Sequence, residues 1–244
     1  MNTFISYDAE LVPVGFDTFD AEQVRGYDQL LSNMGSKSAP MILPRIGGQF
    51  HPDGLATEFA PLEPSSSVAE FLASYTRLKQ KAERMIGGKL CGVDWVDISR
   101  NPEFNVYNAP YLYELAHVLG CSQDWDEHGP RTKVPEEIKS SPIKEIGFHI
   151  HVDVHPKFRE EESQIVPIVL EYEQAINFLR PEWTAPRDPW YRRHTVFRPK
   201  PYGFEYRSFG SSIVENLTRF TALVQISFLF AQDHMKTHNR EYHV

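Results

Sequence analysis

The strongest constraint on the fold is a strict alternation of apolar and polar side chains in the stretch IGFHIHVDVH, residues 146–155. One set of alternate positions holds Ile146, Phe148, Ile150, Val152 and Val154, and the other holds Gly147, His149, His151, Asp153 and His155. A period of two residues is typical of a β-strand with one buried face. The stretch therefore predicts a half-buried strand whose second face carries imidazoles and a carboxylate.

Two interpretations of that second face stay open from this stretch alone. Histidines on the solvent side of an edge strand are common and need no function. A strand also aims every second side chain in one direction, which suits a metal or phosphate site. The rest of the chain has to decide between them.

Composition limits the classes of protein to consider. The 244 residues are 41% hydrophobic and 13% aromatic, which is ample for a packed core, and we expect a single domain over residues 1–244. The formal net charge of −8 disfavours nucleic acid and anionic membrane surfaces as partners. Small-molecule or peptide substrates are favoured instead.

The N-terminus has no signal-peptide pattern, and no window has the roughly 20 apolar residues of a membrane span. Cys91 and Cys121 lie far apart without metal-knuckle spacing, so they are expected to be free thiols. Together these features favour a cytoplasmic protein.

The periodicity along the chain predicts both helices and strands. Strands are expected at 3–14, 55–62, 90–99, 146–155 and 203–210, and helices at 67–86, 110–119, 165–179 and 212–236. Capping boxes are predicted at Ser67 with Glu70 and at Ser212 with Glu215. Loops are expected at 15–54 and 121–142, and an irregular Pro- and Arg-rich segment at 180–203. The pattern predicts an α+β fold with an antiparallel or mixed sheet and packed helices.

A few charged residues fall inside these strand patterns. They are Asp8, Glu10, Glu58, the histidine face with Asp153, Glu205 and Arg207. An acid in such a place is paired with arginine, bound to a metal or solvated, and all three explanations compete here. Carboxylates with imidazoles are a ligand set for Mg²⁺ or Mn²⁺, and no cysteine cluster points to structural zinc.

Arginines supply a second signal beside Glu205. Arg192, Arg193, Arg198 and Arg207 fall within sixteen residues, and guanidinium groups bind phosphate and carboxylate oxygens well. Metal-binding carboxylates next to arginines suggest phosphoryl chemistry on a nucleotide. The competing interpretation is a ladder of Arg and Glu ion pairs across the sheet.

Familiar motifs are missing from the sequence. It has no Walker loop, no G-x-G-x-x-G and no G-x-S-x-G elbow, so an ATP site would have to be built on a sheet face. The H-x-H-x-D run at 149–153 suggests a binuclear zinc hydrolase, but Val154 separates the aspartate from His155, whereas the metallo-β-lactamase pattern has the histidine directly after the aspartate.

Several stretches, in order, resemble one family. They are D-A-E at 8–10, DGLATEFAPLEPSSSVAEF, LGCSQDW, GFHIHVD and, most specifically, FRPKPYGFEYRSFGS. In these the chain resembles the phage carboxylate-amine ligases of the type-2 group, amidoligases that share the catalytic fold of glutamine synthetase and glutamate-cysteine ligase. The resemblance covers most of the chain. It departs from the family at Phe148, where members often have a second glycine, and in Val152 and Asp153, where a glycine often follows.

The resemblance implies a ligase that uses ATP and Mg²⁺ or Mn²⁺ to activate a carboxylate as an acyl phosphate, which an amine then attacks. It implies metal ligation by Glu10, Glu58, His149 and Glu205. It places His151 near the phosphates or the reacting group, and Arg207 and Arg198 on the γ-phosphate, with Arg192 and Arg193 as further candidates. The roles of Asp8 and Asp153 stay open, as do the identities of the acid and the amine and the oligomeric state.

Two other functions are compatible with the sequence. One is a phage structural or host-interaction protein that keeps the fold with a degenerate site. The other is a metal-dependent hydrolase that needs no ATP.

Overall fold

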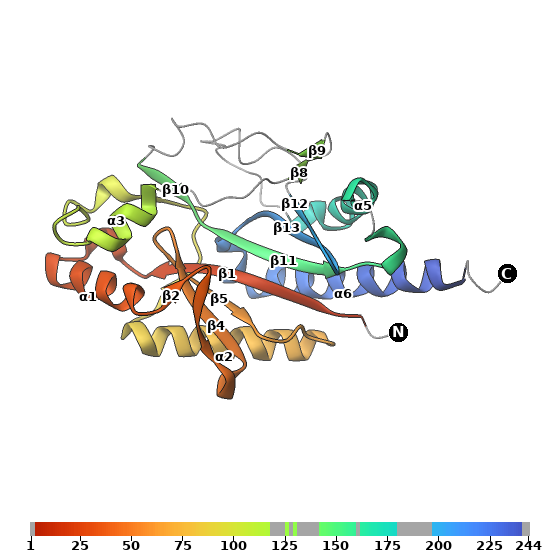
Figure 1. Cartoon of the computed structure of the whole chain (residues 1–244), viewed down its shortest axis with the longest axis horizontal. Helices are drawn as coiled ribbons and strands as arrows, with labels where there is room; N and C mark the ends of the chain where they lie inside the picture. Colours follow the sequence, from red (N-terminus) through yellow and green to blue (C-terminus); the bar gives the residue numbers. More distant parts are fainter. Residues whose placement is uncertain are drawn as a thin grey trace.

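The computed structural model describes residues 3–117, 125–126, 129–130, 142–159, 162–179 and 197–240 (Figure 1). Its main feature is one antiparallel sheet that crosses the molecule. The strand order is β2 (Gly35–Ser36), β3 (Ala39–Leu43), β4 (Gly48–Asp53), β5 (Ala56–Pro61), β1 (Ile5–Pro13), β11 (Gly147–Asp153), β13 (Gly203–Gly210), β12 (Phe197–Lys200), β8 (Trp125–Asp126) and β9 (Gly129–Pro130). The short β6 (Leu90–Cys91) also pairs with β1, and β7 (Trp95–Asp97) and β10 (Ile143–Glu145) form a separate pair. The predicted α+β class is confirmed.

Three helices pack against the sheet. They are α2 (Val68–Ile86), which contacts β5, α5 (Ile165–Ile176), which contacts β13, and α6 (Leu217–Arg240), which contacts β11. In Figure 1 α2 and α6 run lengthwise on the same side of β1 and β11. Two further helices, α1 (Ala21–Ser32) and α3 (Pro110–His117), contact each other near one end. None of the helices in the described part of the chain is long and apolar enough to cross a membrane.

The helix-facing side of the sheet is an aromatic core. The ring of Phe148 stacks on Tyr7 at 6.0 Å between centroids and meets Phe220 of α6 edge-on at 5.3 Å. Tyr172 of α5 meets Tyr206 of β13 at 5.4 Å. The apolar set of the alternating stretch, from Phe148 to Val154, is fully buried here. The predicted strand and its alternation are confirmed, but the strand is not half-buried, because His149 and Asp153 of its polar set are buried too, on the face opposite the three helices.

The first expected loop is wrong. Residues 15–54 contain α1 and the strands β2 to β4. A capping box begins α1, because the Asp20 carboxylate accepts hydrogen bonds from the backbone N–H of Gln23 while the Gln23 side chain accepts from Asp20 N–H. The second expected loop lies mostly outside the described residues, except for β8 and β9.

The expected strand at 90–99 is interrupted between β6 and β7. Gly92 passes so close to the next layer that a Cβ there would lie 1.9 Å from the carbonyl oxygen of Ser211. Its N–H donates to the Glu215 carboxylate at 2.7 Å, which also explains why the expected capping box at Ser212 is wrong. The last helix begins after Asn216 instead, whose side chain accepts from Arg219 N–H at 3.0 Å.

The capping box expected at Ser67 is half right. The Ser67 hydroxyl accepts from Glu70 N–H at 3.2 Å, but the Glu70 carboxylate accepts from Ser66 N–H at 2.8 Å. The helix then ends at Gly87, which has a left-handed backbone. The remaining expected elements are present as β1, β5, α3, α5 and β13, whereas β12 falls inside a segment expected to be irregular.

We predict that Phe148→Ala lowers the free energy of unfolding by about 3–5 kcal/mol, because it leaves a cavity between β11 and α6. Urea denaturation followed by circular dichroism measures the change. The control is Leu229→Ala on α6, where the side chain is 64% exposed and the expected loss is below about 1 kcal/mol. Equal losses in the two variants would contradict the assignment of Phe148 to the core.

Candidate functional site

The face of the sheet opposite the three helices collects charged side chains from six neighbouring strands, β4, β5, β1, β11, β13 and β12. Strand pairing sets Glu10 opposite Glu58, Asp8 opposite His149, and Glu205 opposite both His151 and Arg198. Directly paired residues project to the same side of a sheet. The charged residues that the sequence scatters over two hundred positions therefore meet on one surface.

A β-bulge in β13 fixes the position of Arg207. The register between β11 and β13 shifts between the pairs Phe148 with Phe209 and Ile150 with Tyr206, so Arg207 and Ser208 together face His149. Without the extra residue, Phe209 would point to the charged face. The bulge keeps Arg207 beside Glu205 and returns Phe209 to the core.

Glu205 is the most deeply buried acid of the face, with 1% of its side chain exposed. Its carboxylate contacts the Arg207 guanidinium, lies 2.6 Å from Lys200 Nζ and 3.4 Å from His149 Nδ1, and has Arg198 Nη1 at 3.9 Å. Burial acts to raise the pKa of Glu205, but attraction to Arg207 and the histidines outweighs it and holds the pKa well below its usual value. Glu205 is therefore an ionised carboxylate.

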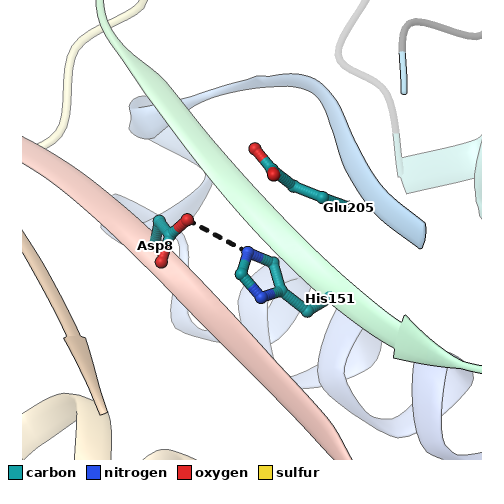
Figure 2. Close-up of side chains that lie close together, drawn as sticks. All are labelled: Asp8, His151 and Glu205. Carbon is teal, nitrogen blue, oxygen red and sulfur yellow. Dashed lines mark hydrogen bonds and ion pairs between the residues drawn. The ribbon is translucent and has the colours of Figure 1, made fainter. Parts of the chain in front are cut away.

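Asp8 and His151 lie beside Glu205 (Figure 2). His151 Nε2 is 3.0 Å from Asp8 Oδ2, and the Tyr202 hydroxyl is 2.8 Å from Nδ1 on the other side of the ring. Burial opposes ionisation of Asp8, but the charge and hydrogen bond of His151 lower its pKa to about 2. The imidazole is held at both nitrogens, which fixes its orientation.

A second acidic group consists of Glu10, Asp53 and Glu58. Burial, and then the nearby Asp53 charge, raises the pKa of Glu10 to about 8. Burial with the charges of Asp8 and Asp53 also raises the pKa of Glu58 well above its usual value. Lys37 Nζ lies 2.6 Å from Asp53 and 3.5 Å from Glu58, and it helps to keep the pKa of Asp53 low against the effect of burial. The group thus combines one ionised and two proton-binding carboxyls.

Gly147 allows the close approach on which Glu10 depends. Its N–H donates to Glu10 Oε2 at 2.7 Å. A Cβ at this position would lie 2.6 Å from His149 Nε2. A larger residue would displace the histidine from the acid.

His149 lies between the two acidic groups. Its Nε2 is 3.6 Å from Glu10, and its Nδ1 is 3.4 Å from Glu205. Burial and the charge of Arg207 lower its pKa to about 3, so the ring is neutral near pH 7. A neutral imidazole is the form that ligates metals.

Two clusters on this face fit a divalent cation. They are Asp8 with His151 and Glu205, and Glu10 with Asp53 and Glu58, and in each the ligand atoms lie within 4.8 Å of one another. Carboxylate oxygens with at most one imidazole suit Mg²⁺ or Mn²⁺ rather than zinc. Glu10, Glu58 and Glu205 belong to these clusters, and His149 lies between them.

The structure also brings His151, Arg198 and Arg207 to this face, whereas Arg192 and Arg193 lie outside the described residues. Asp153 belongs to neither cluster and forms an ion pair with Arg159, whose Nη2 is 2.7 Å from the Asp153 carboxylate. His155 accepts a hydrogen bond from Lys157 N–H and lies beyond the end of β11. The assigned roles of all these residues stay predictions.

Sequence reasoning missed Lys37, His51, Asp53, Lys200 and Tyr202. His51 and Asp53 stand two residues apart in QFHPDG, before a turn at Gly54 that pairs β4 with the strand of Glu58. That spacing was a usable signal for a second polar strand face. Lys37 offered none, because its approach to Glu58 depends on the β2–β3 hairpin.

Comparison with known proteins adds no family. No family model, no curated protein and no solved structure matches this chain. Membership of the carboxylate-amine ligases therefore stays a prediction from the sequence motifs.

We predict that the contribution of Glu10 to stability, in the absence of divalent cations, is lost as the pH rises from about 4.5 to about 8, the interval over which folding moves its pKa. Within it this carboxyl binds more protons in the folded state than in the unfolded state, so raising the pH makes its contribution less favourable to folding. Glu10→Gln removes this contribution, so its stability relative to the unmodified protein should increase towards pH 8.

Thermal melts in EDTA at several pH values measure the effect. Glu63→Gln, at an exposed position, is the matched control and should follow the unmodified protein. Parallel curves of stability against pH for Glu10→Gln and the unmodified protein would show that folding does not raise the pKa of Glu10.

Proposed function

We propose that this protein is an ATP- and Mg²⁺-dependent carboxylate-amine ligase that forms an amide through an acyl phosphate. The observation that carries the proposal is the pair of acidic clusters on one sheet face, joined by His149 and bordered by Arg198, Lys200 and Arg207. The motif resemblance points to the same activity. A cytoplasmic, phage-encoded enzyme is part of this proposal.

The acidic clusters support the metal requirement. Concentrating carboxylates of one sign is unfavourable unless cations offset them. In the second cluster Lys37 is the cation in contact, and the pKa values of Glu10 and Glu58 are raised despite it. Bound Mg²⁺ would supply charge neutralisation at phosphate oxygens. Glu10, Asp53 and Glu58 would hold one such ion, and Glu205 of the other cluster would be a ligand of a second.

The basic residues fall into two groups by the exposed fraction of their side chains, and each group has a different proposed role. Only 6% of the Arg207 side chain is exposed, and its guanidinium contacts Glu205, so it positions that acid and His149. Arg198 and Lys200 are 18% and 27% exposed at the border of the same cluster. These two side chains are better placed to bind the γ-phosphate and to stabilise charge during its transfer.

The proposed reaction has two steps on this surface. A substrate carboxylate oxygen attacks the γ-phosphorus and ADP leaves. The amine nitrogen then attacks the acyl carbon, phosphate leaves, and the amine gives up a proton. Arg198 and Lys200 hold the transferred phosphoryl oxygens, while the His151 imidazole, oriented by Asp8 and Tyr202, lies at the edge of the reacting region.

The alternatives explain less of the face. An ion-pair ladder accounts for Glu205 and its basic partners, but not for three carboxyls together around Glu10. A scaffold with a degenerate site gives no reason to keep Glu10 and Glu58 opposite each other. A zinc hydrolase favours more imidazoles per metal than either cluster supplies.

We predict that the protein binds Mg-ATP and that Glu205→Gln and His149→Ala each weaken binding about tenfold or more, because they remove a ligand or the residue that positions it. Isothermal titration calorimetry, with thermal melts to verify folding, measures this. Glu63→Gln, exposed and outside the site, should bind as the unmodified protein does.

Failure of the folded, unmodified protein to bind ATP would contradict the ligase proposal. Metal analysis would then distinguish a hydrolase, which retains a cation, from a structural protein, which has none. Binding that persists unchanged in both variants would place the nucleotide elsewhere.

A further inference from the structure

A cavity of about 480 Å³ opens beside the charged face, at the end of β1 and β11 away from Glu10. Its lining includes Phe4, Ser6, Leu62, His151, Asp153, Arg159 and Tyr202. Its volume is that of a small-molecule site. His151 and Tyr202 belong to both the cavity and the candidate active site, so the two are continuous.

The same sheet face changes from acidic to apolar in steps of two residues. Along β1 it runs from Glu10 through Asp8 and Ser6 to Phe4, because alternate residues share a face. From Asp8 to Ser6, which already lines the cavity, the distance is about 7 Å at the rise of an antiparallel strand. A small molecule with a ring and a two-carbon arm is long enough to reach from the cavity to this acid.

The charged groups inside the cavity neutralise each other. Arg159 Nη2 lies 2.7 Å from the Asp153 carboxylate, and its Nε donates to the Val154 carbonyl oxygen at 2.8 Å. This pair forms a fixed, electrically balanced part of the wall. Most of the remaining lining is apolar, so the cavity selects a hydrophobic body rather than a charged one.

The charge at the mouth selects the other end of the ligand. Asp8 is the acid next to Ser6 on this face, and its Oδ2 lies 3.0 Å from His151 Nε2. The cations Arg198, Lys200 and Arg207 gather around Glu205, on the strands beyond β11. A ligand that leaves the cavity past His151 towards β1 therefore reaches Asp8, the partner of that histidine.

We infer that this cavity binds the apolar body of the amine substrate, a primary amine with an aromatic or branched aliphatic group, and directs its ammonium towards Asp8. That this amine is a substrate rests on the proposed ligase function. The binding itself needs neither ATP nor turnover.

The test uses 2-phenylethylamine as probe, with 2-phenylethanol and ethylamine as matched ligands that lack the charge or the ring. Calorimetry with the full chain in Mg²⁺ should show the amine binding about tenfold more tightly than either, since each lacks one of the two recognised parts. Asp8→Asn should remove the preference for the amine over the alcohol.

Leu62→Trp fills the cavity without adding charge and should weaken binding of the amine about tenfold or more, because it occupies the space of the ring. Ile42→Trp is the matched control, since Ile42 is an exposed aliphatic residue on β3 outside the cavity. It should bind the amine normally.

The outcomes separate this inference from the ligase proposal. Equal binding of amine and alcohol, or equal binding by Leu62→Trp and Ile42→Trp, overturns the amine pocket even where Mg-ATP binds normally. Amine binding with these preferences in a protein that fails to bind ATP supports the pocket and rejects the ligase. Loss of Mg-ATP binding in Leu62→Trp would assign the cavity to the nucleotide and overturn the inference.

Discussion

The architecture of the charged face depends on the pairing of Glu10 with Glu58 across β1 and β5. Burial raises the pKa values of both acids, and the charge of Asp53, with that of Asp8 at Glu58, adds to the effect. The chain offsets this with Gly147 N–H donating to Glu10 and with Lys37 beside Glu58 and Asp53. The aromatic core behind the sheet supplies the stability that lets such an arrangement persist, since Tyr7 and Phe148 stack directly behind the same strands.

The two acidic clusters differ in how their charge is compensated. Asp8 and Glu205 are held ionised by His151, Arg207 and Lys200. In the other cluster Lys37 helps to lower the pKa of Asp53 against the effect of burial, while the pKa values of Glu10 and Glu58 are raised, which favours a bound proton on these two acids. A divalent cation would replace that proton, which makes cation binding at Glu10, Asp53 and Glu58 dependent on pH. At the first cluster protein side chains already balance the charge.

The sequence predicts those parts of the fold in which local pattern and tertiary contacts agree. Alternation in β11 and β13 placed Glu205 and His149 on one face, and helical spacing with a serine cap predicted α2. The local pattern did not predict α1. Val24, Tyr27 and Leu31 have helical spacing there, but Asp28 interrupts the apolar stripe. Asp28 is there to cap α3, accepting from Leu112 N–H at 2.7 Å. That tertiary role cannot be seen from the local pattern.

The site residues that the sequence did not predict were missed for the same reason. Lys200 ends β12 and Tyr202 lies in the turn that follows, and β12 contains Pro199 and charged neighbours and depends on pairing with β13 and β8. Lys37 reaches Asp53 and Glu58 through the hairpin of β2 and β3. Acids can be located from a strand pattern because burying them is exceptional, whereas their lysine partners arrive on long side chains from segments with no pattern of their own. The acidic half of such a site is therefore more predictable than the basic half, and the bulge that aims Arg207 is visible only in the paired strands.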